Sequence, residues 1–318
     1  MKLQTTIPWY PIGQTQIDYD SSVLLLGSCF VENIVNKLDY FKFQNLHNTF
    51  GILFHPLAIE QLISNAIHNK GYIENDIFFH NERWHSFDAH SNLSASSKEK
   101  LISRLNEQIK LTNQFLHKAT HIIITLGTAW SYRHLNSDFI VSNCHKLPHG
   151  EFSKELLSHI QISDSLKSMV KQVRSINKTS TIIFTVSPIR HLKDGFIENS
   201  QSKAHLISAI HSILDTQQDK KIHYFPSYEL MMDELRDYRF YSEDLIHPNQ
   251  IAINYIWMKF QEYWISQNAT NTMNEIAAIQ KDLQHKPFNP NSEAHQKFIE
   301  TLMDRQSILR SKYPHVTF

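Results

Sequence analysis

Four short, mostly apolar runs divide the chain, at residues 23–26, 121–126, 181–186 and 222–225. Each run stops at a glycine, a serine or a proline. A continuous apolar run of this length is typical of a parallel strand that is buried on both faces. Longer segments with helical spacing separate the runs, so the pattern predicts alternating strands and helices in a doubly wound parallel sheet.

Apolar residues at helical spacing, together with start and stop signals, mark the remaining elements. The predicted helices lie at 30–38, 56–67, 98–117, 154–159, 165–176, 200–214, 228–235 and 251–264. A less regular run at 41–46 predicts one more strand, and aromatic alternation at 77–84 predicts a small hairpin. Residues 268–313 read as two helices broken at Pro287 and Pro290. We therefore expect one domain over residues 1–265 and a helical extension over 266–318 that packs on it.

Composition narrows the class of protein. The 318 residues are 41% hydrophobic and carry equal numbers of basic and acidic side chains, which argues against non-specific nucleic-acid binding. Two cysteines do not make a disulfide framework, the first twenty residues lack a signal-peptide pattern, and no apolar window reaches the ~18 residues of a membrane span. We expect a cytoplasmic protein, and the sequence leaves its oligomeric state open.

Candidate chemistry lies where predicted strands end. Ser28 follows the first strand, and Asp244 and His247 stand three residues apart just before Pro248, which suits a helix start. A serine hydroxyl attacks only if a base takes its proton, and a carboxylate fixes the tautomer of that base. Since ligand sites lie at the carboxyl ends of such strands, we expect these three side chains to meet there.

A tetrahedral oxyanion also needs hydrogen-bond donors. The backbone N–H of Ser28, at the start of a helix, is one candidate, and Gly51 is another because a glycine lets the backbone approach a substrate closely.

Several motifs together resemble one known family. Gly27-Ser28-Cys29-Phe30, with Asp244 and His247 late in the chain, is similar to the GSCFA family of the SGNH/GDSL hydrolase superfamily, although Val31 stands at the fifth position in place of alanine. The resemblance covers roughly the first 265 residues. Further matching segments are residues 48–53, 126–130, 143–146, 187–191, 194–195 and 233–241.

The resemblance implies a three-layer α/β/α sandwich with a flavodoxin-like parallel sheet. It also implies serine-dependent ester or acyl chemistry without a metal or another cofactor. Ser28 matches the nucleophile, His247 the base and Asp244 the third member of the triad, while Gly51 matches the oxyanion-hole glycine of the second block.

The third block departs from the superfamily pattern, because Ala129 stands where an asparagine donor is usual. Thr128, Asn48 or Arg190 are the candidate replacements for that donor.

Other residues keep two interpretations. Ser28 fits a helix cap as well as a nucleophile, and Cys29 fits a thiol nucleophile or a small buried apolar group. Cys144 and His145 suggest metal binding or packing. Basic side chains that suit an anionic substrate group or salt bridges are Arg190, His191 and Lys203, and rings that suit a pocket wall or the core are Trp130 and Phe50.

Three functions fit these residues. The first is an esterase or deacylase that acts on an acylated small molecule or carbohydrate. The second is an acyltransferase that uses the same triad with a sugar hydroxyl as acceptor. The third is a non-catalytic binding protein on the same fold.

Overall fold

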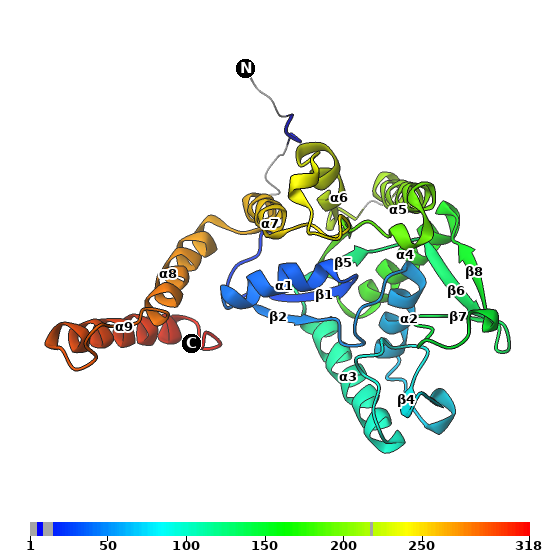
Figure 1. Cartoon of the computed structure of the whole chain (residues 1–318), viewed down its shortest axis with the longest axis horizontal. Helices are drawn as coiled ribbons and strands as arrows, with labels where there is room; N and C mark the ends of the chain where they lie inside the picture. Colours follow the sequence, from blue (N-terminus) through cyan, green and yellow to red (C-terminus); the bar gives the residue numbers. More distant parts are fainter. Residues whose placement is uncertain (1–4, 9–14, 217–218) are drawn as a thin grey trace.

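A five-stranded parallel sheet forms the centre of the computed structural model, which describes residues 5–8, 15–216 and 219–318 (Figure 1). Its strands lie in the order β10-β9-β5-β1-β2, and all neighbouring pairs are parallel. Their bounds are β1 (Ser22–Gly27), β2 (Gln44–His47), β5 (His121–Leu126), β9 (Thr181–Val186) and β10 (Ile222–Phe225). Counted along the chain this is the 2-1-3-4-5 order of flavodoxin-like folds, so the predicted fold class is confirmed.

Helices cover both faces of the sheet, because alternate strand residues point to opposite sides. Leu24 and Leu26 pack in one apolar cluster, whereas Val23 and Leu25 pack in another. The first cluster is completed by α2 (Pro56–Ile67), α3 (Lys98–Lys118), α4 (His159–Ile176) and α5 (Phe196–Thr216). The second is completed by α1 (Phe30–Tyr40), a π-helical turn η5 (Leu230–Glu234) after the short α6 (Ser227–Glu229), and α7 (Gln250–Trp264).

Two small antiparallel sheets stand beside the central one. The predicted hairpin is present as β3 (Phe78–His80) and β4 (Arg83–His85). The second small sheet has the order β7-β6-β8 and contains β6 (Trp130–His134), β7 (Phe139–Val141) and β8 (Phe152–Leu156).

Two local predictions were wrong. Residues 154–159 were expected to be helical, but Lys154 pairs with Tyr132 across β8 and β6, and α4 starts only after the Ser158 cap. A distant pairing partner therefore overrides local helix preference. The strand expected at 41–46 begins later, because Lys42 has a φ of 62° and turns the chain out of α1 before β2 can start.

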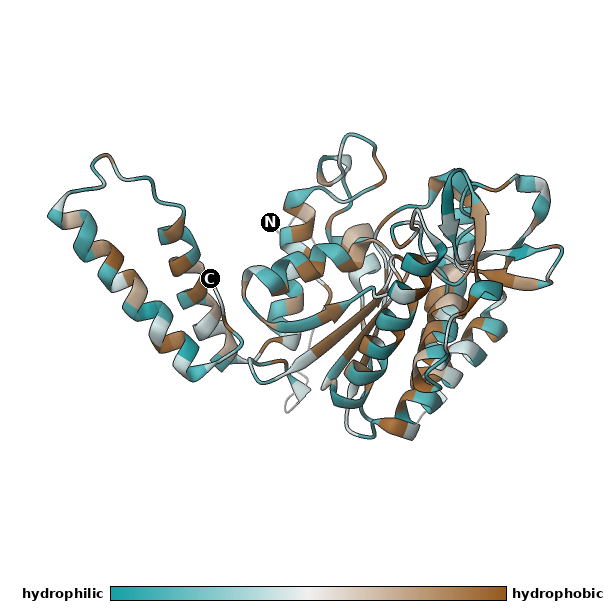
Figure 2. Ribbon diagram, turned by 90° about the horizontal axis from the view of Figure 1, so that it is seen from below, coloured by the Kyte–Doolittle hydropathy of each residue, from teal (hydrophilic) through white to brown (hydrophobic). Residues whose placement is uncertain are grey.

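The C-terminal residues form a helical hairpin that projects from the side of the molecule where α1 and α7 lie (Figures 1 and 2). Its helices are α8 (Gln267–Leu283) and α9 (Glu293–Lys312), and the predicted break at Pro287 and Pro290 lies between them. Met273 and Ile276 of α8 and Leu309 of α9 join the same apolar cluster as α1 and α7. The hairpin is thus anchored to the main domain through its buried side chains.

Gly27 allows the end of β1 to run against β5. Its φ is 134°, and a Cβ at this position would lie 2.0 Å from the carbonyl oxygen of Thr125. A side chain here meets both backbone strain and a steric clash that no flexible group can relieve. The glycine therefore fixes the path by which the chain enters Ser28.

We predict that Gly27→Ala lowers the free energy of unfolding by about 2–5 kcal/mol, through positive-φ strain and overpacking. Gly150→Ala is the matched control, because a Cβ there would contact nothing within 4 Å, and its effect should stay within about 0.5 kcal/mol. Urea unfolding followed by circular dichroism measures both. Equal stability of the two variants would contradict the constraint.

Candidate active site

Ser28 lies in the turn between β1 and α1, at the carboxyl edge of the sheet where the strand order reverses. Its side chain is fully buried, and its Oγ has no hydrogen-bond partner among the described residues. The N-cap of α1 is Cys29, without a side-chain capping bond, so Ser28 does not serve as the cap of that helix. A buried hydroxyl without a partner is costly, and such atoms are often found at reactive sites.

Asp244 and His247 form the contact that their spacing predicts. His247 Nδ1 lies 2.6 Å from Asp244 Oδ2, and Asp244 Oδ1 accepts the backbone N–H groups of Ile246 and His247 at 2.9 and 3.0 Å. Because a carboxylate only accepts, Nδ1 carries the proton and Nε2 is left as a base. The N–H of His247, then that of Ile246 and then the imidazole lower the pKa of the Asp244 carboxyl to about 2.

Arg190 holds this turn in place. Its backbone N–H donates to the Ile246 carbonyl and its Nη1 to the Leu245 carbonyl, each at 3.3 Å. Its guanidinium also lies 5.4–5.9 Å from the centres of three rings, those of Phe196, Tyr238 and Tyr241. Within the described part of the chain these contacts are to carbonyls and aromatic faces, not to carboxylates. Arg190 therefore binds the turn that bears His247 through hydrogen bonds, and its charge is stabilised by cation–π contacts.

A row of contacts places Ser28 and the Asp244–His247 turn at the same end of the sheet. A Cβ on Gly127 would lie 3.1 Å from the Cβ of Ser28, and the Gly127 N–H donates to the Phe54 carbonyl at 2.8 Å. The Phe54 ring meets His191 edge-on at 5.6 Å, and the N–H of the neighbouring Arg190 donates to the carbonyl of Ile246, just before His247, at 3.3 Å.

The two halves are nevertheless not joined by a hydrogen bond. Ser28 Oγ is buried and has no partner in the described ranges, whereas the His247 side chain is 50% exposed. Catalytic hydrogen bonds often tighten only when a substrate binds.

Three groups expected to donate to an oxyanion are engaged inside the protein. The Ser28 N–H donates to the Thr125 carbonyl at 3.0 Å, and the Gly51 N–H donates to the Asn48 carbonyl at 2.7 Å. The Thr128 hydroxyl lies 3.0 Å from Ser202 Oγ and accepts the Trp130 N–H at 3.0 Å. The requirement for glycine at position 51 comes from the fold and not from a substrate, because its φ is 73° and a Cβ there would clash with a side-chain oxygen of Asn92.

Asn48 is placed differently. Its Oδ1 accepts the Gly27 N–H at 2.9 Å, which fixes the orientation of the amide, and its Nδ2 is buried without a partner among the described residues. Its φ of 37° lies in the left-handed region, which asparagine tolerates better than most residues. The side chain thus presents a free N–H₂ donor next to the residue that precedes Ser28.

Lys203 is a supporting residue whose role the sequence did not predict. It is 1% exposed, and its Nζ donates to the carbonyls of Gly127 at 2.7 Å and Ser187 at 2.8 Å, at the ends of β5 and β9. It therefore binds backbone carbonyls instead of making the salt bridge or anion contact considered from the sequence. Burial lowers its pKa to about 7. Lys203 shares one helical stripe with Leu206, Ile210 and Ile213, which is the signal for its burial.

His191 and Trp130 lie at the side of the site. Burial, then Lys203 and then His247 lower the pKa of His191 to about 3, so its imidazole stays neutral. Its Nε2 is buried without a partner among the described residues. Trp130 is half-buried, donates from Nε1 to the Glu198 carbonyl at 3.3 Å, and has Lys154 Nζ 4.4 Å from its ring centre.

The cysteines have the character of packed thiols. Both are free, and burial raises the pKa of Cys29 and raises that of Cys144 to about 11, which disfavours the thiolate. The His145 ring nitrogens are taken by Ser91 Oγ at 2.9 Å and the Ser86 carbonyl at 2.7 Å.

Across the described ranges, no group of three or more His, Cys, Asp or Glu side chains is arranged to hold a metal ion. No helix there is long and apolar enough to cross a membrane.

The doubly wound sheet, with helices on both of its faces, defines a three-layer α/β/α protein of flavodoxin-like topology. The chain belongs to the GSCFA family, whose model matches residues 22–260. The C-terminal domain of GSCFA domain proteins matches residues 276–318. The predicted domain boundary after residue 265 falls between the two matched segments.

One solved structure similar to this chain is an acetyl xylan esterase, Est2A, from the rumen bacterium Butyrivibrio proteoclasticus. The two are 9% identical with a TM-score of 0.37 over 83% of this chain, which spans 65% of that protein's length. No curated protein matches the sequence.

We predict that Lys203→Met changes how stability depends on pH. Between about pH 7 and the ordinary lysine pKa of 10.5, the unfolded chain binds more protons than the folded chain, so Lys203 makes the free energy of unfolding rise with pH. Methionine removes this rise and leaves two carbonyls without a donor.

Urea unfolding of both proteins from pH 6 to pH 10 measures the effect. The free energy of unfolding of wild type minus that of the variant should be constant below about pH 7 and should increase above it. A constant difference over the whole range would contradict the buried, titrating lysine.

Proposed function

We propose that this protein is a serine-dependent esterase or deacylase, with Ser28 as nucleophile, His247 as general base and Asp244 orienting the base. The observation that supports this most is the short Asp244–His247 contact within one turn, at the same sheet edge as a buried Ser28 hydroxyl that has no partner among the described residues. The substrate class we propose is an acylated small molecule or carbohydrate.

In the proposed reaction, Ser28 Oγ attacks the acyl carbon while its proton passes to His247 Nε2. The tetrahedral intermediate then expels the alcohol, which takes that proton, and leaves an acyl-serine. Water attacks the acyl-serine with His247 again as base, and the second intermediate expels Ser28 Oγ, which takes the proton back from His247 as the acid is released. Asp244 stays ionised throughout, since its pKa is about 2. The reaction requires His247 to approach Ser28 more closely, through rotation of side chains or movement of the turn at 242–247.

We infer that Asn48 supplies the donor for the oxyanion. The Ser28 and Gly51 amides and the Thr128 hydroxyl are engaged internally, whereas Asn48 Nδ2 is buried without a partner in the described ranges. Its Oδ1 is held by the Gly27 N–H, so the donor is pre-oriented and needs little reorganisation during reaction. Asn48 would then supply the hydrogen bond that the superfamily usually makes with an asparagine at the position of Ala129.

The enzymatic proposal predicts hydrolysis of short-chain nitrophenyl esters. Ser28→Ala should lower kcat by about 10³-fold or more, because the nucleophile is lost. Cys29→Ala is the matched control from the same turn and should keep wild-type activity. If Ser28→Ala keeps its activity and Cys29→Ala loses it, the thiol is the nucleophile and the proposal fails.

The same assay separates the other two functions. Supplying sugar alcohols and analysing products by mass spectrometry shows whether the acyl group goes to water or to an acceptor. Transfer that dominates over hydrolysis would make the protein an acyltransferase. A binding protein would turn over no ester in either assay.

The role of Asn48 predicts a loss in kcat. Asn48→Asp keeps an oxygen for the Gly27 N–H and tolerates the same φ, but removes the N–H₂ donor. We expect kcat to fall about 10²–10³-fold while KM changes little and the melting temperature shows a folded protein. Wild-type kcat in this variant would rule out Asn48 as the oxyanion donor.

A further inference from the structure

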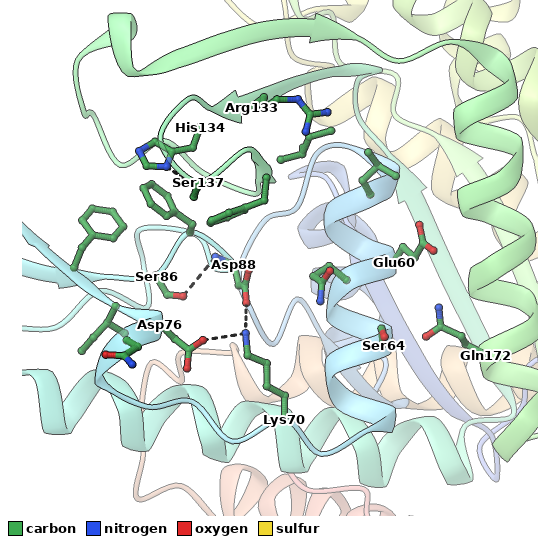
Figure 3. Close-up of a pocket in the computed structure, with 18 residues that line it drawn as sticks. Glu60, Ser64, Lys70, Asp76, Ser86, Asp88, Arg133, His134, Ser137 and Gln172 are labelled. Carbon is green, nitrogen blue, oxygen red and sulfur yellow. Dashed lines mark hydrogen bonds and ion pairs between the residues drawn. The ribbon is translucent and has the colours of Figure 1, made fainter.

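A cavity of about 790 Å³, apart from the candidate active site, lies between α2, the β3–β4 hairpin and the β6–β7 hairpin (Figure 3). Neither Ser28 nor His247 lines it. Its volume is in the range of small-molecule sites. The cavity therefore raises a question separate from the proposed ester chemistry.

One wall of the cavity is aromatic. The Phe87 ring lies 4.3 Å from that of Phe78, 4.9 Å from that of His134 and 5.7 Å from that of Phe139, measured between ring centres. Phe139 is 40% exposed, and the other three are half-buried. These rings pack against one another in tilted and edge-on arrangements, and part of their surface stays uncovered beside the cavity, which is unusual for side chains that only fill a core.

A second wall offers polar groups. Glu60, Gln61 and Ser64 line it from α2, and in Figure 3 Glu60 and Ser64 lie on the side of this helix that faces Gln172. Gln172 also lines the cavity, and its Oε1 is buried without a partner among the described residues. The wall therefore presents mainly hydrogen-bond acceptors, which suit hydroxyl donors.

Asp88 adds a fixed carboxylate at the base of the cavity. Its Oδ2 accepts from Lys70 Nζ at 3.0 Å and from the Tyr72 hydroxyl at 2.8 Å. These partners hold the side chain in one position, as a pre-organised acceptor should be held.

Both cations of the lining are already bound to acids. Lys70 Nζ lies 3.2 Å from Asp76 and 3.0 Å from Asp88, and Arg133 Nε lies 2.7 Å from Glu155. An anionic ligand would have to break one of these pairs and would also meet the Glu60 side chain. The charges thus favour a neutral ligand.

We propose that this cavity binds a neutral saccharide. A pyranose ring has an apolar C–H face that packs on aromatic rings and a rim of hydroxyls that donate to carboxylates and amides. The lining of the cavity offers both surfaces, in the rings around Phe87 and in the polar groups of α2, Gln172 and Asp88. The assignment needs no turnover and does not depend on the role of Ser28.

Ligand-observed NMR titrations in the Ser28→Ala background test it, with xylobiose, cellobiose and chitobiose as neutral probes. Glucuronic acid serves as the anionic probe and adenosine as a planar aromatic one. We expect at least one neutral disaccharide to bind with a millimolar Kd, and the two other probes to bind more weakly. No binding by any neutral disaccharide, or tighter binding of glucuronic acid or adenosine, would overturn the proposal.

Variants locate the binding. Phe139→Ala should weaken saccharide binding about three- to ten-fold, because it removes an aromatic contact. Phe79→Ala is the matched control, since this ring is exposed on the opposite face of β3 from Phe78. Ser64→Tyr, which adds bulk from the α2 wall, should also block binding. Unchanged affinity in both Phe139→Ala and Ser64→Tyr would place the saccharide elsewhere and refute the site.

Discussion

The close approach of β1 and β5 at their carboxyl ends is the constraint on which the site depends. At Gly27 the backbone passes so near the Thr125 carbonyl that no side chain fits between them. The next residue, Ser28, then donates its N–H to that same carbonyl, and Gly127 packs against the Ser28 side chain. Backbone packing, more than side-chain contacts, therefore sets the position of the serine.

Two charged side chains at the Ser28 end of the sheet, one buried and one exposed, stabilise different parts of the candidate site. On the inside, Lys203 joins the ends of β5 and β9, and burial brings its pKa near neutrality. On the outside, Asp244 keeps its charge because backbone N–H groups stabilise it, and it orients His247. The proposed nucleophile, Ser28, belongs to the buried interior, and the proposed base, His247, belongs to an exposed turn that Arg190 contacts, so the proposed triad depends on how closely that turn approaches the sheet.

The parts that follow from local pattern were predictable from the sequence. The strand at 121–126 and the helix at 56–67 have the predicted bounds, because a mostly apolar run and a proline start are strong local signals. The Asp244–His247 contact was predictable because the two residues stand three positions apart on one turn. The strand β8 was missed because its pairing partner in β6 is distant in sequence.

The state of the oxyanion donors could not be read from the sequence either. Whether the amides of Ser28 and Gly51 are free depends on carbonyls that the fold brings to them. Asn48 and Lys203 acquire their environments in the same way, through neighbours on other strands. Residue identity gave the candidate groups, and only their three-dimensional partners distinguished the free ones from the engaged ones.

The central claim is that Ser28 is a nucleophile activated by the Asp244–His247 turn. The most direct test is reaction of the intact protein with a fluorophosphonate probe, followed by intact-mass measurement and peptide mapping, in wild type and in His247→Ala. We expect a single adduct on Ser28 in wild type and much slower labelling in the variant. An unmodified Ser28 in wild type, or equal labelling rates in the two proteins, would contradict it.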